Sequence, residues 1–138
     1  MATFTASILI NTSAKKVFDA LTKPELIRRW QFDKTLTTDW RPGSRIQFNA
    51  VFEGRVLEQW GTVIEIRPNE LVKYNLFTPR PGLEDKTENY CTTTYILTAK
   101  NNATRLELIQ EDNRPGSYAP ISLMPILAVL KKVVEVNS

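Results

Sequence analysis

The residue types that carry most enzyme chemistry are scarce in this chain of 138 residues. It has no histidine and one cysteine, Cys91, which is expected to be a small buried residue on a strand. This excludes Ser-His and Cys-His catalytic pairs and removes the most common general base and the usual zinc ligands. The five glycines occur singly, so no glycine-rich phosphate-binding loop is present. The sequence therefore predicts no catalytic residue, no metal ligand and no cofactor.

Carboxylates are the remaining candidates for acid-base chemistry. Those on or beside predicted elements are Asp19, Glu58, Glu65, Glu88 and Glu107. Each is expected to face solvent, because an unpaired carboxylate is rarely buried. One alternative stays open, in which a cyclase- or hydrolase-type enzyme uses Glu58 together with Tyr95. Such acid-base work requires both groups within about 3 Å of a substrate atom.

Hydroxyl and aromatic side chains are better candidates, and the chemistry that they favour is binding. Small-molecule sites are largely apolar, with a few polar groups that orient the ligand. Tyr74 shares one side of a predicted strand with Leu76, and Thr93 shares one side of the next strand with Tyr95. The alternative is that both tyrosines only reach the rim of the sheet and bond to water. The predicted ligand-binding residues are Phe48, Trp60, Tyr74, Leu76, Thr93, Tyr95, Ile126 and Leu130.

A strand and two short helices come first among the elements that must position these residues. Residues 3–10 alternate as a strand with one buried face does. Ser13 can cap a following helix with its side-chain oxygen. Pro24 keeps Lys23 out of the helical region, so this helix ends before Pro24, which can itself begin a second helix. Trp30, at the end of the second helix, is expected to pack in the core.

Five alternating runs then predict an antiparallel meander, because the connections between successive runs are mostly short. The segment before them, residues 31–42, has no clear period and is expected to be a long connection closing over one end of the fold. Residues 78–88 contain Pro79, Pro81 and Gly82 and predict an exposed loop. The runs are Arg45 to Phe52, Val56 to Ile66, Leu71 to Phe77, Tyr90 to Thr98 and Thr104 to Glu111.

The last segment changes to a helical period. Its apolar residues, at steps of three and four, predict an amphipathic helix of about four turns. Pro125 is tolerated only in the first turn, so a start near Ser122 is predicted. The whole chain, residues 1–138, is therefore expected to be a single α+β domain with its helices on one side of a sheet. A curved sheet wrapped about the last helix leaves room for a pocket.

Composition excludes several classes of protein. Apolar content of 42% and charged content of 24% are typical of globular domains. The net charge of +3 comes from scattered cations, so no nucleic-acid partner is expected. No apolar run approaches the roughly 20 residues of a membrane span, so no membrane insertion is expected. The absence of a secretory signal at Met1–Thr5 and the single cysteine favour a cytoplasmic location.

Four short motifs resemble a known family. They are Ala20-Leu21-Thr22-Lys23-Pro24 with Trp30, Pro42-Gly43, Gly61 to Pro68, and Thr104-Arg105-Leu106. Together they resemble the START-related helix-grip superfamily (SRPBCC), and most closely its branch named for the activator of heat-shock-protein-90 ATPase. The resemblance implies a START/Bet v-like fold, in which a curved sheet of six to seven antiparallel strands is crossed by a long C-terminal helix on its concave face. It also implies a cavity for a small, mostly apolar molecule.

Besides the enzyme alternative, two functional hypotheses follow from these residues and this resemblance. The leading hypothesis is a domain that binds an apolar or amphipathic, lipid- or polyketide-like molecule in an internal cavity. The second is a chaperone-interacting module of the heat-shock-protein-90 ATPase activator type, since fold alone does not decide function. Either would act as a monomer or a homodimer.

Overall fold

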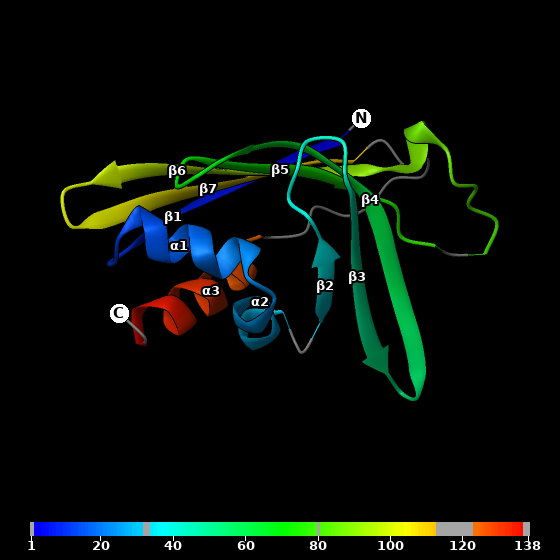
Figure 1. Cartoon of the computed structure of the whole chain (residues 1–138), viewed down its shortest axis with the longest axis horizontal. Helices are drawn as coiled ribbons and strands as arrows, with labels where there is room; N and C mark the ends of the chain where they lie inside the picture. Colours follow the sequence, from blue (N-terminus) through cyan, green and yellow to red (C-terminus); the bar gives the residue numbers. More distant parts are fainter. Residues whose placement is uncertain (1, 32–33, 80, 113–122, 137–138) are drawn as a thin grey trace.

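The computed structural model describes residues 2–31, 34–79, 81–112 and 123–136. Figure 1 shows the arrangement of its elements. In chain order these are β1 (Ala2–Ile10), α1 (Ala14–Thr22), α2 (Pro24–Trp30), β2 (Thr35–Thr38), β3 (Arg45–Phe52), β4 (Arg55–Arg67), β5 (Leu71–Leu76), a short 3-10 helix η1 (Thr87–Asn89), β6 (Cys91–Lys100), β7 (Ala103–Asp112) and α3 (Met124–Val136).

The strands form one seven-stranded sheet in the order β1-β7-β6-β5-β4-β3-β2, with every neighbouring pair antiparallel. The first strand pairs with the last, because α1 and α2 carry the chain from one edge of the sheet to the other. All three α-helices of the described chain lie on the same face, which we call the concave face (Figure 1). This arrangement confirms the predicted α+β helix-grip fold. No helix in the described ranges is long and apolar enough to cross a bilayer.

The boundaries of α1 and α2 follow from their predicted local signals. Ser13 is the N-cap of α1, and its side-chain oxygen accepts a hydrogen bond from the Lys16 amide at 3.3 Å. Pro24 is the first residue of α2, where its missing N–H costs no hydrogen bond. Trp30 packs in the core, and its indole Nε1 donates to the carbonyl oxygen of Ala20 at 2.8 Å. The last turn of α1 is thereby held by a side chain of α2.

The connection predicted over residues 31–42 contains a strand instead. Residues 35–38 form β2, which pairs with β3 so that Leu36 lies opposite Phe48. Four residues are too few for an alternation with a period of two to be recognised in the sequence. Leu36 is buried while Thr35 and Thr37 are exposed. The partner strand, rather than any local pattern, determines this element.

The sheet bends where β4 pairs with β5. Trp60 forms an isolated bridge with Phe77, and the β4–β5 register shifts between Val63 and Glu65. A Cβ atom on Gly61 would lie 1.9 Å from the backbone oxygen of Asn75, so only glycine permits this approach. Beyond the bend, the hairpin of β3 and β4 projects away from the rest of the sheet (Figure 1).

The two halves of α3 have different surroundings. Its second half is fastened to the end of β1: the Lys131 ammonium donates to the Leu9 carbonyl oxygen at 2.9 Å, and the Glu135 carboxylate accepts from the Asn11 amide at 2.8 Å. Lys131 and Glu135 also pair with each other. Pro125 lies in the first turn, as predicted, although Ser122 lies outside the described residues. The first half of α3 covers a part of the sheet away from the end of β1.

Candidate functional site

A cavity of about 340 Å³ lies between the start of α3, the end of α2 and the concave face of the sheet. Pro125, Ile126 and Val129 of α3 form one wall of it. The remaining lining residues are apolar or aromatic (Trp30, Phe48, Leu76) and polar (Gln31, Lys34, Gln59, Tyr74, Thr93, Tyr95, Gln110). The cavity falls within the usual size of small-molecule sites, about 300–1,000 Å³.

Tyr74 and Tyr95 form the buried polar part of this lining. They come from the adjacent strands β5 and β6, where Tyr74 is paired with Thr93 and Tyr95 with Val72. Each residue is 5% exposed, and the two hydroxyl groups lie close enough to influence each other's pKa. Burial raises the pKa of Tyr95 to about 12 and that of Tyr74 well above its ordinary value, to which the neighbouring Tyr95 hydroxyl adds. Both hydroxyls are therefore neutral at physiological pH and act as donors or acceptors.

A tryptophan supports this tyrosine pair from the side of α1. The Trp40 ring meets the Tyr74 ring edge-on, with centroids 6.2 Å apart. The Phe48 ring also lies beside Tyr74, with centroids 5.9 Å apart. Aromatic rings hold each other in such tilted or edge-to-face arrangements. The Tyr74 side chain is thus positioned by two neighbours before any ligand binds.

Lys34 lies just after α2, and its side chain borders the cavity. Its ammonium donates to the Gln59 side-chain oxygen at 3.3 Å and lies 6.0 Å from the centre of the Phe48 ring. Gln59 in turn donates to the Thr78 hydroxyl at 2.8 Å. Burial lowers the pKa of the Lys34 ammonium.

A second hollow of about 500 Å³ adjoins the cavity. The two share Lys34, Phe48 and Gln59, so these side chains separate them. The second hollow extends along the projecting hairpin and is lined there by Ala50, Val56, Leu57, Glu58, Trp60, Thr78 and Pro79.

The structure brings six of the eight predicted ligand-binding residues together around the cavity. They are Phe48, Tyr74, Leu76, Thr93, Tyr95 and Ile126. Leu130 does not reach the cavity, because it is fully buried in the core between α3 and the sheet. Whether these residues bind a ligand stays a prediction.

The predicted position of Trp60 is wrong. Phe48 of β3 lies opposite Gln59 of β4, so Gln59 shares the concave face and Trp60 points to the other face. There the Trp60 indole donates to the Asp85 carboxylate at 2.9 Å, and its ring lies 5.4 Å from Phe77. The tryptophan holds the segment around Asp85 and borders the second hollow instead.

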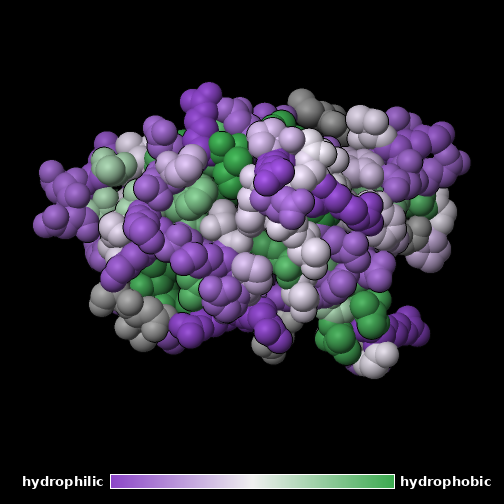
Figure 2. All heavy atoms as spheres, in the orientation of Figure 1, coloured by the Kyte–Doolittle hydropathy of each residue, from purple (hydrophilic) through white to green (hydrophobic). Residues whose placement is uncertain are grey.

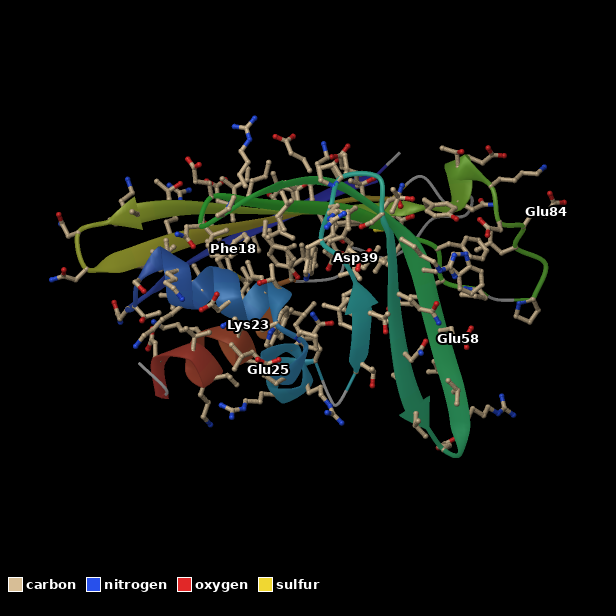
Figure 3. The ribbon with its side chains drawn as sticks, in the orientation of Figure 1. Phe18, Lys23, Glu25, Asp39, Glu58 and Glu84 are labelled. Carbon is tan, nitrogen blue, oxygen red and sulfur yellow. The ribbon has the colours of Figure 1, made fainter. Side chains whose placement is uncertain are left out.

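The proposed pairing of Glu58 with Tyr95 is contradicted by their positions. Glu58 is exposed on the projecting hairpin (Figure 3), whereas Tyr95 is buried and lines the cavity. Asp19 pairs with Lys15 at 3.0 Å on the helix surface. Among the described residues that line the cavity there is no carboxylate. Nor does any group of three His, Cys, Asp or Glu side chains in the described ranges have the arrangement of a metal site.

Several cavity residues were not predicted from the sequence. Gln110 lies two positions after Leu108 on β7, so strict alternation along this strand could have placed it on the concave face. Trp30 was expected only to pack, yet it also borders the cavity. The sequence contains no such signal for the remaining cavity residues, because only the packing of α2, α3 and the bend in β4 brings them together. These are Gln31, Lys34, Gln59, Pro125 and Val129.

Comparisons with solved structures agree with this fold. The X-ray structure of protein MLL2253 from Mesorhizobium loti has a TM-score of 0.78 at 20% identity, over 99% of both chains. The solution structure of ChR145 from Cytophaga hutchinsonii has a TM-score of 0.71 at 28% identity, over 99% of this chain and 86% of that one. The solution structure of the Aha1 dimer from Colwellia psychrerythraea has a TM-score of 0.70 at 18% identity, over 100% and 99%.

Sequence comparison identifies the family. No curated protein matches the chain. The family model described as Activator of Hsp90 ATPase homolog 1-like protein matches residues 11–122, which include α1, α2 and strands β2 to β7. The match confirms the resemblance seen in the four short motifs. This protein therefore belongs to the Activator of Hsp90 ATPase homolog 1-like family.

Proposed function

We propose that this protein binds a small, mostly apolar molecule in the cavity beneath the first half of α3. The observation that carries the proposal is the composition of the cavity lining. Apolar side chains alternate with neutral hydrogen-bonding groups, and the buried Tyr74 and Tyr95 hydroxyls are among the latter. A core built only for stability favours Leu, Ile and Val at such positions.

The lining also indicates how the ligand is held. Removal of apolar ligand surface from water supplies about 25 cal/mol per Å², before the costs of ordering are subtracted. The Tyr74 and Tyr95 hydroxyls are neutral, so each can donate its proton to an acceptor on the ligand. A ligand with one carbonyl or hydroxyl group at its buried end matches this arrangement.

Thermal-shift and calorimetric titrations with fatty acids, sterols and aromatic polyketides test the proposal. Ile126→Trp is expected to fill the cavity and abolish binding, because Ile126 lines it and is 39% exposed. Ile64→Trp is the matched control, since Ile64 is 40% exposed and does not line the cavity. Binding that survives Ile126→Trp, or no stabilisation by any member of the panel, would contradict the proposal.

A second candidate function is contact with a chaperone of the heat-shock-protein-90 type, and an exposed apolar surface favours it. Val51, Val56 and Leu57 lie on the projecting hairpin and are 75%, 62% and 52% exposed. Figure 2 shows apolar side chains gathered at the end of this hairpin. Exposed apolar groups of this kind mark interaction surfaces. The family is named for an activator of this chaperone.

A binding assay separates the two candidate functions. Purified heat-shock-protein-90 from the same organism is titrated with the wild-type protein and with a Val56→Ser/Leu57→Ser variant. The chaperone function requires stoichiometric binding that this variant weakens by about tenfold or more. Ile126→Trp serves as the control, because it alters the cavity and leaves the hairpin surface unchanged. Absence of binding by the wild-type protein would exclude the chaperone function alone.

A further inference from the structure

Lys34 occupies the boundary between the cavity and the second hollow. Its backbone amide donates to the Gln31 carbonyl oxygen at 3.2 Å, which places it directly after the last turn of α2. Its side chain borders both hollows. The Phe48 ring, 6.0 Å from the ammonium, and the Gln59 oxygen, 3.3 Å away, hold it there.

This ammonium has only a neutral partner in the part of the chain that the structure describes. Its hydrogen bond goes to an amide oxygen, and no ion pair with a described carboxylate involves it. Three lysines on or beside the helices do have such partners: Lys15 and Lys23 pair with Asp19, and Lys131 pairs with Glu135. A partly buried cation without a counter-ion is stabilised by any anion that reaches it.

The charges around Lys34 restrict the kind of anion. Lys34 is the only cation among the described residues that line either hollow, so it can balance one negative charge. A phosphate monoester carries about −1.5 to −2 at neutral pH, which would leave charge uncompensated. Glu58, in the second hollow, repels an anion on that side. A single carboxylate beside Lys34, with its apolar part inside the cavity, is the arrangement that these charges favour.

We propose that the ligand of the cavity is an amphipathic monocarboxylic acid, whose carboxylate pairs with the Lys34 ammonium while its apolar part lies against Phe48, Ile126 and Val129. This inference rests on the proposed binding function and specifies its ligand class. Tyr74 and Tyr95 then face the end of the ligand away from the carboxylate, where a carbonyl or hydroxyl group can accept a hydrogen bond, and Lys34 determines which end of the ligand lies beside the second hollow.

A matched series of ligands tests the inference. Decanoate, decanol and decyl phosphate have the same chain and differ in the charge of the head group. Calorimetric titration of the wild-type protein is expected to show that decanoate binds about tenfold or more tightly than decanol, as a charge-assisted hydrogen bond provides. Decyl phosphate is expected to bind less tightly than decanoate. Equal affinity for decanoate and decanol, or a preference for the phosphate, would overturn the inference.

Substitutions of Lys34 provide the second part of the test. Lys34→Met is expected to weaken decanoate binding about tenfold or more and to leave decanol binding within about twofold. Lys34→Arg is expected to retain the preference for decanoate, and Lys132→Met, on the exposed side of α3, is the control. Equal loss of both ligands in Lys34→Met would contradict the charge pairing and leave the proposed function intact. If none of the three ligands binds and the wider panel also fails, the proposed function fails and this inference fails with it.

Discussion

The indole Nε1 of Trp40 donates a hydrogen bond to the carbonyl oxygen of Thr22 at 2.8 Å, and this contact joins the segment after β2 to the last residue of α1. Carbonyl groups at a helix end lack partners within the helix, so the indole satisfies one of them. Trp40 has φ 54°, a left-handed conformation that is unfavourable for a large side chain. The same ring contacts Tyr74, so the contact links the end of α1 to the cavity wall.

Trp40→Phe is expected to lower the free energy of unfolding by about 1–2 kcal/mol, because the Thr22 carbonyl loses its donor while most of the ring contact remains. Urea denaturation followed by circular dichroism measures this loss. Trp60→Phe is the control: its indole donates to the exposed Asp85 carboxylate, which water can solvate, so a clearly smaller loss is expected. Equal losses in the two variants would show that the Trp40 bond has no special role.

Gly61→Ala is expected to destabilise the protein by about 3 kcal/mol or more, since the new methyl group would overlap backbone atoms of Asn75 and force β4 and β5 apart. Gly54→Ala is the comparison. Gly54 has φ 77° and open space around it, so its substitution costs only backbone strain of about 1–2 kcal/mol. Urea midpoints of both variants measure the difference. A smaller loss for Gly61→Ala than for Gly54→Ala would contradict the close approach of these strands.

The buried tyrosines predict a loss of stability in alkali. Tyr95 has a pKa of about 12 in the folded protein, against about 10 when unfolded, so the unfolded chain releases its proton first. Their contribution is complete below pH 10 and is lost as the pH rises through the folded pKa. Between pH 10 and 12 the unfolding free energy of the wild-type protein falls as the pH rises. In Tyr95→Phe this fall is expected to be shallower, by the slope that corresponds to the release of about one proton on unfolding.

Urea denaturation at pH 9, 10 and 11 measures this slope for the wild-type protein, for Tyr95→Phe and for Tyr90→Phe. Tyr90 is the comparison because it lies outside the cavity, where its hydroxyl donates to Asp85; partial burial and this carboxylate also raise its pKa, so Tyr90→Phe is expected to make the fall shallower by a smaller amount than Tyr95→Phe. The same slope in Tyr95→Phe and in the wild type would mean that Tyr95 ionises equally easily in both states.

The fastening of α3 to β1 predicts an effect in acid. The Asn11 amide, and then the Lys131 ammonium, lower the pKa of the Glu135 carboxyl by hydrogen bonding to its charged form. Its contribution is present above the unfolded pKa and disappears as the pH falls through the lowered folded pKa. Glu135→Gln is therefore expected to reduce the unfolding free energy at pH 7 by about 1 kcal/mol or less, since the pair is partly exposed, and to have no effect in strong acid.

Urea denaturation at pH 7 and below pH 3 checks this expectation, with Glu58→Gln on the exposed hairpin as the control. A loss that is the same at both values would show that Glu135 acts through its shape rather than its charge. A loss as large in Glu58→Gln would point to a general effect of net charge.

Much of the framework was predictable because its signals are local. Ser13 and Pro24 set the limits of two helices through hydrogen bonds and φ restrictions within a few residues. Alternation along β5 and β6 placed Tyr74 and Tyr95 on one face, and both are buried there. The family resemblance in the short motifs agrees with the family match over residues 11–122.

The sequence alone determined the order of the elements and the face of most strands, since caps, prolines and period-two alternation act over neighbouring residues. Only the tertiary structure decided β2, the outward position of Trp60 and the place of Lys34 between two hollows. Each of these depends on a partner distant in the chain: β3 for β2, the Phe48–Gln59 register for Trp60, and the bend at Gly61 for the hairpin beside Lys34. Such pairings are set by packing across the sheet, and no local pattern records them.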